Sequence, residues 1–336
     1  MSAWAFYTAH MSENFYFSNT IYCRYFNENG TELGSSYRSA VFPEYTVYCE
    51  RRHGVKFMSL SDAPNGKYDY PVPLVNRTLK EPEHFLSVCV AALYGKEPKW
   101  LMLAELIEHY KLQGATHFYI YIQELDEYSR ILVDDYIRTG EVEQIVLHDH
   151  SNRTDWKWHI LSVLECLVRA RGHSQWIIFG DLDERLITTD YPGTISDFIR
   201  NVKDPKIAAL QFRQRWILRN DTMPAHYVNK SQILNWMPTR RYHNTSHVGP
   251  PAHTERSIID PKKVDLQTVK IDIYLKQEIT SLRHYRDVRA WDWGKNYLKR
   301  VEAMGNFSMT DYPKKFMAQL TANVQRRVHY VYGNDS

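Results

Sequence analysis

The sequence predicts an α/β fold with a mostly parallel sheet covered by helices on both faces, preceded by a small β-rich region. Between residues 85 and 179, apolar runs of strand length alternate with segments whose apolar residues recur at helical spacing. Before residue 60, short aromatic and β-branched runs are separated by Asn, Gly and Ser, which is typical of strands joined by turns. We therefore divide the chain into a β-rich region with its linker, residues 1–82, and an α/β domain, residues 83–336.

The β-rich region is expected to hold short strands at residues 15–17, 21–26 and 45–48. Residues 61–76 contain three prolines and one glycine. Because proline lacks a backbone donor and fixes φ, these residues predict an irregular linker between the two parts.

The α/β domain begins with three strand-and-helix units and a fourth strand. The expected strands are residues 85–93, 117–122, 142–147 and 176–179. The expected helices are residues 100–110, 129–139 and 156–168, followed by Gly114, Gly140 and Gly172. Helix-length connections predict parallel strands, since such crossovers are right-handed and cover both faces of the sheet. Beyond them we expect a helix at 194–202, a strand at 207–212 and long polar loops up to Ile258.

The amino-acid composition argues against a nucleic-acid partner and suits a carbohydrate partner. Forty-two basic and 39 acidic residues leave a formal charge of +3, which excludes the strong basic excess typical of nucleic-acid binding. The aromatic fraction of 14%, with 24 Tyr and 9 Trp, is high, which suits a carbohydrate partner even though most rings are expected in the core. No apolar run reaches the roughly 18 residues that a membrane helix needs, so we expect no membrane span in this chain.

Acceptor triplets for N-glycans indicate the secretory pathway. Chance gives roughly two N-x-S/T triplets in a chain of this composition. Eight are present, beginning at Asn29, Asn76, Asn152, Asn220, Asn229, Asn244, Asn306 and Asn334. The four cysteines are compatible with disulfides, although their pairing is left open.

An acidic segment, Asp181-Leu182-Asp183-Glu184, directly follows the fourth predicted strand. Its side chains should lie at the carboxyl edge of the sheet, where open α/β folds bind ligands. Two carboxylates one residue apart can hold one divalent cation, which in turn can bridge the two phosphates of a nucleotide sugar. The segment therefore predicts a metal and diphosphate site.

Several short motifs together resemble glycosyltransferase family 92, over roughly residues 83–330. They are Ser87-Val88-Cys89-Val90-Ala91-Ala92, Lys99-Trp100, Glu108-His109-Tyr110, Gly114-Ala115-Thr116-His117-Phe118-Tyr119, Tyr136 with Gly140-Glu141-Val142, Phe179-Gly180-Asp181-Leu182-Asp183-Glu184, Ser257-Ile258-Ile259-Asp260-Pro261-Lys262-Lys263-Val264 and His284-Tyr285-Arg286. One departure is that residues 265–273 contain no histidine, where many relatives are expected to have one.

The resemblance implies a GT-A-like, Rossmann-type fold and a manganese-dependent, inverting enzyme. It further implies transfer of galactose from UDP-galactose in β1,4 linkage to a glycan acceptor, such as fucose or galactose of an N-glycan. Members of this family are typically type II membrane proteins of the Golgi. We therefore expect function in the Golgi lumen and a full-length form with a membrane anchor outside this sequence.

The metal ligands expected from the motif and the resemblance are Asp181, Asp183 and His284. Asp181 and Arg286 are expected to contact the donor, Arg286 through a bidentate contact with phosphate. An inverting transfer also needs a carboxylate to take the proton of the acceptor hydroxyl. Glu255 and Asp221 are the candidates, because both fall in the irregular region expected to cover the acceptor site.

Three other interpretations are weighed against this one. A phosphatase of the haloacid-dehalogenase type also uses an Asp-x-Asp motif, but Arg185 stands where that motif has Thr or Val. A glycan-binding protein or an inactive pseudo-transferase would keep the fold without turnover. His243, His247 and His253 could be read as a zinc cluster, but they have no cysteine partners and fit a surface or acceptor loop better.

Overall fold

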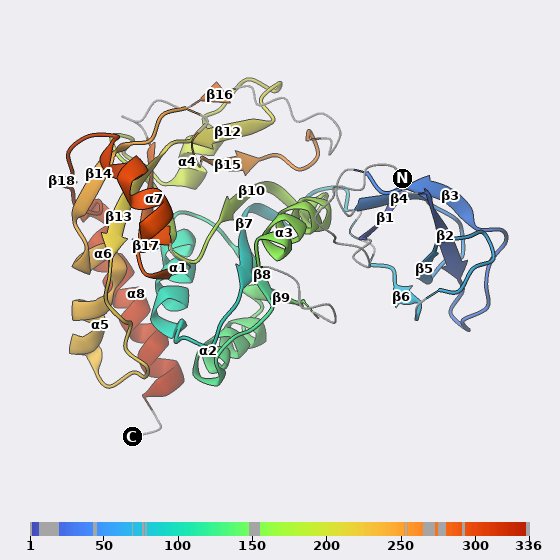
Figure 1. Ribbon diagram of the computed structural model, residues 1–336, viewed down its shortest axis with the longest axis horizontal. Helices are drawn as coiled ribbons and strands as arrows, with labels where there is room; N and C mark the ends of the chain where they lie inside the picture. The colour runs from blue at the N-terminus through green and yellow to red at the C-terminus, as the bar shows by residue number, and fades with distance from the viewer. Residues whose placement is uncertain are drawn as a thin grey trace.

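The structure is a computed structural model that describes residues 2–6, 20–42, 46–68, 70–75, 77, 79–147, 155–251, 253, 255–264, 273–274, 280–290 and 293–333. Within these ranges the chain forms a seven-stranded sheet and a five-stranded sheet, and two smaller sheets lie near the N-terminus (Figure 1). The predicted α/β class, with a mostly parallel large sheet, is confirmed.

Four adjacent parallel strands, in the spatial order β10-β7-β8-β9, form one side of the large sheet, with β9 at its edge. They are β7 (His84–Leu93), β8 (His117–Ile122), β9 (Val142–Val146) and β10 (Ser174–Gly180). The connecting helices are α1 (Trp100–Leu112), α2 (Glu127–Arg138) and α3 (Asp155–Ala170). These seven elements are the predicted ones, with ends shifted by a few residues.

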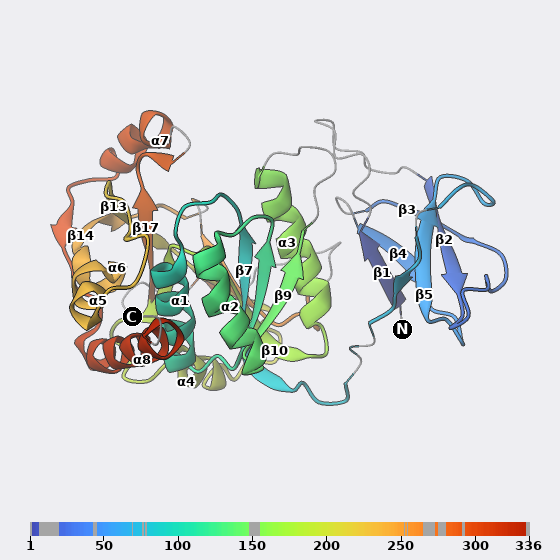
Figure 2. The same ribbon diagram turned by 90° about the horizontal axis from the view of Figure 1, so that it is seen from below.

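Helices cover both faces of this sheet because successive residues of a strand point to opposite sides. In β8, Phe118 and Ile120 pack into the cluster that contains α1 and α2, whereas Tyr119 and Tyr121 pack into the cluster that contains α3. Figure 2 shows α1 and α2 on one side of the strands and α3 on the other. A disulfide between Cys89 of β7 and Cys166 of α3 joins the sheet to its helix.

Past β10, the large sheet continues with one strand of the opposite direction and then with two strands that run in the same direction as β10. β15 (Arg256–Ile259) runs antiparallel to both β10 and β12 (Ala209–Phe212), and β16 (Ile273–Tyr274) pairs with β12. The predicted helix at 194–202 is α4 (Ile195–Arg200), which begins with a capping box at Thr194 and Asp197.

The expectation of long loops from residue 212 to Ile258 is wrong. This region contains β13 (Gln214–Arg219), α5 (Lys230–Trp236), α6 (Pro238–Arg241) and β14 (Asn244–Val248). The second sheet has the order β11-β17-β13-β14-β18, with β11 (Glu184–Thr188), β17 (Thr280–Asp287) and β18 (Ser308–Met309). Its strands are short and pair with distant segments, so no local periodicity marks them. α7 (Trp293–Glu302) and α8 (Lys314–Tyr332) complete the domain.

The N-terminal region is β-rich, as predicted. β1 (Ser2–Phe6) pairs with β4 (Thr46–Glu50), and a second sheet has the order β3-β2-β5-β6. Its strands are β2 (Thr20–Phe26), β3 (Tyr37–Ala40), β5 (Phe57–Ser61) and β6 (Val72–Pro73). Cys23 and Cys49 form a disulfide between β2 and β4.

The linker is not wholly irregular, because Val72 and Pro73 form a two-residue strand at a sheet edge, where proline is tolerated. The strand expected at 15–17 lies outside the described residues. Both views show these sheets beside the α/β domain (Figures 1 and 2), and the boundary at residue 82 stays a prediction. No helix among the described residues is long and apolar enough to cross a membrane.

Candidate functional site

The acidic segment lies where the two large sheets meet. β10 ends at Gly180, the chain turns through Asp181, Leu182 and Asp183, and β11 begins at Glu184. The turn is closed by a hydrogen bond from the Glu184 amide to the Asp181 carbonyl, at 3.1 Å. The Asp183 carbonyl accepts from the Tyr285 amide of β17 at 2.8 Å. The carboxylates therefore sit at the carboxyl edge of the parallel strands, as their place in the sequence predicts.

His284 faces this turn from the neighbouring strand. It stands directly opposite Glu184 in the antiparallel pairing of β11 with β17. His284 Nε2 lies 3.4 Å from Asp183 Oδ2, and the imidazole is buried. A histidine 101 positions after Asp183 is thus brought into contact with it by strand pairing alone.

The other nitrogen of His284 is held by the side-chain oxygen of Gln214 and lies near that of Glu184. Nδ1 lies 3.1 Å from Gln214 Oε1 and 3.2 Å from Glu184 Oε1. Because the amide oxygen of Gln214 can only accept a hydrogen bond, Nδ1 carries a proton and Nε2 is the nitrogen directed at Asp183. Trp216 stacks on the ring, with centroids 4.5 Å apart, and fixes its plane. Among the described residues, Nε2 has no hydrogen-bond partner.

Asp181 has different neighbours. Arg256 of β15 donates to Asp181 Oδ2 through Nη2 and to Glu184 Oε2 through Nε, the latter at 2.6 Å. His159 of α3 places Nδ1 3.6 Å from Asp181 Oδ1. Arg256 therefore holds two of the three acidic side chains of the segment.

These contacts set the charge of each group. Burial opposes ionisation of Asp183, but His284 and Arg286 outweigh it and hold the pKa of this carboxyl well below its usual range. Burial likewise opposes ionisation of Asp181, and Arg256 and His159 bring its pKa below the usual value. For Glu184 burial prevails and raises the pKa. Asp181 and Asp183 are thus ionised at neutral pH.

Arg286, the residue predicted to contact phosphate, also lies at the turn. Its Nη1 is 3.9 Å from Asp183 Oδ2, and its guanidinium lies over the Trp293 ring at 5.6 Å from the centroid. Arg219 of β13 donates from Nε to the Tyr285 carbonyl at 3.1 Å. The edge of the turn therefore carries arginines from two neighbouring strands.

The donor groups fit a divalent cation in part. Asp183 and His284 offer a carboxylate oxygen and an unpartnered imidazole nitrogen at close range. The Asp181 carboxylate can join them once the Arg256 guanidinium releases Oδ2. The residues present therefore fit the predicted ligand set, with Arg256 as a competitor for one ligand.

The two candidates for the catalytic base lie in different surroundings. Asp221 is paired with Arg241 at 2.8 Å and accepts a hydrogen bond from the Tyr242 hydroxyl. Burial raises the pKa of the Asp221 carboxyl, but Tyr242 and Arg241 outweigh it, so the pKa is below its usual value. Glu255 immediately precedes Arg256, which places its backbone next to the acidic turn. Both roles stay predictions.

Sequence reasoning missed Arg256, His159, Gln214 and Trp216. Arg256 directly precedes the quoted motif that begins at Ser257, so extending that motif by one residue would have included it. Gln214 and Trp216 belong to β13, in a region expected to be loop. The segment without histidine, residues 265–273, lies almost wholly outside the described residues.

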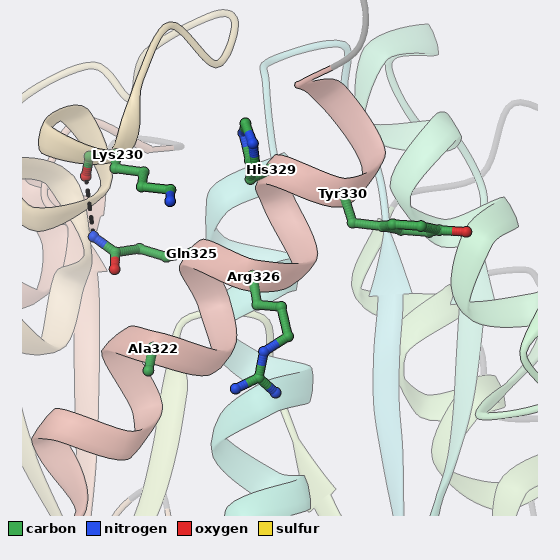
Figure 3. Close-up of a pocket in the computed structure, with 6 residues that line it drawn as sticks. All are labelled: Lys230, Ala322, Gln325, Arg326, His329 and Tyr330. Carbon is green, nitrogen blue, oxygen red and sulfur yellow. Dashed lines mark hydrogen bonds between the residues drawn. The ribbon is translucent and has the colours of Figure 1, made fainter.

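The other histidines and the described pocket lie elsewhere. His243 binds Asp311 and the Arg240 carbonyl, and within the described residues it forms no three-ligand cluster with His247 and His253. A pocket of about 530 Å³ lies along the outer side of α8 (Figure 3). It is lined by Lys230, Ala322, Gln325, Arg326, His329 and Tyr330 and contains no residue of the acidic turn.

Comparison with solved structures finds remote similarity to glycosyltransferases. A mannosyltransferase from Pyrobaculum calidifontis, in complex with GDP-mannose and Mn²⁺, matches 76% of this chain and 76% of its own, with 11% identity and a TM-score of 0.34. TarS from S. aureus, in complex with UDP-GlcNAc, matches 74% of each chain, with 11% identity and a TM-score of 0.34.

The comparison with known protein sequences gives a more specific result than the comparison with solved structures. A protein of Caenorhabditis elegans described as a β-1,4-galactosyltransferase is 28% identical over 192 residues, which are 52% of this chain and 44% of that protein. The chain thus spans less than half the length of this relative. The family model for glycosyltransferase family 92 matches residues 84–320, which include every residue of the acidic turn and of β17. The chain belongs to glycosyltransferase family 92.

Proposed function

We propose that the protein is an inverting, metal-dependent glycosyltransferase that moves galactose from UDP-galactose, in β1,4 linkage, onto a glycan acceptor. The observation that carries this proposal is the approach of His284 Nε2 to Asp183 Oδ2, at 3.4 Å, beside Asp181 and two arginines. A carboxylate and imidazole set with flanking guanidinium groups has the charges that a metal-bound nucleoside diphosphate requires.

Asp181, Asp183 and His284 would hold the cation, which we take to be Mn²⁺. When bound, the cation neutralises the charge that develops on the departing diphosphate. The Gln214 amide oxygen orients the imidazole by accepting from Nδ1. Glu184, buried and next to Nδ1, supports the same orientation.

Arg286 and Arg256 would bind the diphosphate oxygens. The Arg286 guanidinium is held over Trp293, which leaves its edge for a charge-assisted hydrogen bond. Arg256 now pairs with Asp181 and Glu184, and a diphosphate offers it oxygens of the same charge. If Arg256 exchanged these carboxylates for diphosphate oxygens when the donor binds, Asp181 would become available as a ligand of the cation.

A carboxylate must take the proton of the acceptor hydroxyl, and Glu255 and Asp221 are the candidates. Direct displacement by that hydroxyl turns an α-linked donor into a β-linked product. Between the two, Glu255 is favoured because it directly precedes Arg256, whose side chain contacts the acidic turn.

The galactose and its β1,4 linkage are supported by the Caenorhabditis elegans relative, which is described as a β-1,4-galactosyltransferase, and the acceptor is inferred from the family resemblance. We infer a fucose or galactose residue of an N-glycan as the acceptor, and the Golgi lumen as the compartment. The two disulfides support an oxidising compartment for this chain.

The test is an assay of the purified chain with UDP-galactose, Mn²⁺ and a panel of N-glycans, followed by mass spectrometry for the product and measurement of released UDP. Asp183→Asn should abolish transfer without unfolding the protein, whereas Asp134→Asn, at an exposed position of α2, should not affect it. Full transfer in excess chelator would contradict metal dependence.

Two further readouts separate the parts of the proposal. Preference for UDP-glucose or UDP-GlcNAc would refute the donor, and an α-anomeric product in the NMR spectrum would refute inversion. Glycan binding without any UDP release would identify the chain as a glycan-binding protein or a pseudo-transferase.

A further inference from the structure

Three histidines gather at the opposite end of the parallel sheet from the acidic turn. His84 and His117 are the first residues of β7 and β8, and His173 directly precedes β10. Because β10, β7 and β8 are adjacent and parallel, the beginnings of these strands share one edge. One ligand atom of each ring lies within 4.8 Å of the others. The seven residues of β10 separate this cluster from Asp181 by roughly 25 Å.

Two of the rings have one nitrogen held by a hydroxyl group. His84 Nδ1 lies 2.9 Å from Thr116 Oγ1, and His173 Nδ1 lies 2.5 Å from Tyr119 Oη. Tyr119 Oη also lies 3.0 Å from Ser174 Oγ, so it can donate there while it accepts from Nδ1. This arrangement leaves Nε2 of both rings with a free lone pair, as in histidines that bind metals.

The third ring is buried without hydrogen bonds. His117 is 8% exposed, and neither of its ring nitrogens has a hydrogen-bond partner among the described residues. Its Nε2 is 3.6 Å from Glu143 Oε2, beyond hydrogen-bond range but close enough to be oriented by that carboxylate. Leaving a buried imidazole unsatisfied costs free energy, and a ligand at Nδ1 would remove that cost.

A carboxylate completes the set. Glu83 places Oε2 3.4 Å from His173 Nε2 and Oε1 3.9 Å from His84 Nε2, and its side chain is 63% exposed. Glu83 thus faces the two nitrogens that the hydroxyl groups leave free. Three imidazoles and one carboxylate are the donor types of a four-coordinate zinc site.

The charges around the cluster are compatible with a cation. Glu143 offsets Arg77 and Arg169, with which it pairs, and Glu83 adds a further negative charge.

We propose that His84, His117 and His173, with Glu83, bind a divalent transition metal of the zinc type at this edge of the sheet. By binding all three histidines, the ion would link the N-terminal ends of β7, β8 and β10. It is distinct from the cation of the acidic turn, because nitrogen-rich ligands select zinc whereas carboxylate-rich ones suit manganese. The proposal stands independently of the transferase activity.

The test measures metal content and stability, without any assay of transfer. The full chain is stripped with chelator, reloaded with Zn²⁺, desalted and measured by mass spectrometry for bound metal. Asp183→Asn is used as the background, so that the acidic turn contributes little. We expect one Zn²⁺ per chain, its loss in His84→Gln, and its retention in His53→Gln, where an exposed histidine serves as the matched control.

Two further measurements cover the case in which His84→Gln folds poorly. Co²⁺ bound to the Asp183→Asn protein should give the strong visible absorption of a four-coordinate site, and Glu83→Gln, at an exposed position, should weaken it. Saturating Zn²⁺ should raise the melting temperature by roughly 5 °C. No retained Zn²⁺ in the Asp183→Asn protein, or equal retention in folded His84→Gln, would overturn the proposal.

Discussion

Arg185 and Glu105 form an ion pair in which neither side chain is exposed to solvent, with Arg185 Nε 3.2 Å from Glu105 Oε1. The same guanidinium donates to the carbonyls of Leu182 and Glu184, both at 2.8 Å. It therefore links helix α1 to the backbone of the acidic turn. Arg185, which disfavours a phosphatase motif in the sequence, has a structural role in holding the candidate ligands.

Glu105→Gln should destabilise the protein, because it leaves the Arg185 charge buried without its partner. Breaking a buried ion pair from one side typically costs about 3–5 kcal/mol. Urea unfolding followed by circular dichroism measures the change. Glu81→Gln, at an exposed position, is the control and should stay within about 0.5 kcal/mol of the wild type. A loss below about 1 kcal/mol for Glu105→Gln would mean that the pair is not essential to the turn.

His284→Gln should weaken Mn²⁺ binding while the fold persists. Nε2 is the imidazole nitrogen directed at Asp183, and glutamine cannot place a nitrogen lone pair there. We expect at least roughly tenfold weaker binding, since loss of even an outer partner of a ligand costs 10- to 100-fold. Titration followed by electron paramagnetic resonance of free Mn²⁺ gives the affinity. His226→Gln, at an exposed site, should match the wild type, and equal affinities for all three proteins would remove His284 from the ligand set.

Replacing both Cys89 and Cys166 with alanine should lower stability more than replacing Cys23 and Cys49. The two disulfides span 77 and 26 residues, and the longer loop restricts the unfolded chain more. Chain entropy alone predicts losses of about 4.5 and about 3.5 kcal/mol. Melting temperatures of the two double variants provide the measurement. The reverse order would show that strain or residual structure, and not loop length, sets the contribution of these disulfides.

The sequence was informative where local pattern determines structure. The run at β8 alternates between two apolar environments over the length of a strand, and its predicted and observed ends coincide at His117 and Ile122. The acidic turn could likewise be placed, because a ligand edge follows from the end of a parallel strand. His284 was singled out through the family motif, and its contact with Asp183 follows from strand pairing.

Non-local pairing explains what the sequence did not reveal. β13 pairs with β17 from Gln214–Leu282 onward, across nearly 70 residues, so neither strand carries a local mark of its partner. Gln214 and Trp216 of that strand, and Arg256 of β15, therefore had no predicted place beside the acidic turn. The histidine cluster was missed for the same reason, since its members begin three separate strands.

Exposed acceptor asparagines should carry glycans when the chain is made in a secretory host. All five acceptor sites in the described part of the chain are exposed. They are Asn29, Asn220, Asn229, Asn244 and Asn306. Removal of N-glycans with an endoglycosidase should shift the gel mobility, and peptide mapping should identify occupied sites. Unchanged mobility would contradict the inferred compartment.

His109 should make stability depend on pH. The ring lies fully buried between Tyr312 Oη and the Leu186 carbonyl, each 2.8 Å from one nitrogen. Burial, together with the nearby Arg185 charge, lowers its pKa to about 3, and the Leu186 carbonyl only partly opposes this. Tyr110, whose ring meets that of His109 at 4.6 Å, remains uncharged in this range because burial raises its pKa to about 12.

The direction of the effect follows from proton binding. Between about pH 6.5 and about pH 3, unfolded His109 binds a proton that the folded ring cannot accept, so the folded state loses stability as the pH falls. From pH 7 to pH 5 this group alone should contribute a loss of about 2 kcal/mol. His84 and His173 add to the same trend, since burial lowers their pKa values too. His109→Gln should therefore reduce the pH dependence of the free energy of unfolding in urea without abolishing it. If this free energy changed equally with pH in the variant and the wild type, His109 would titrate in the folded state as it does in the unfolded chain.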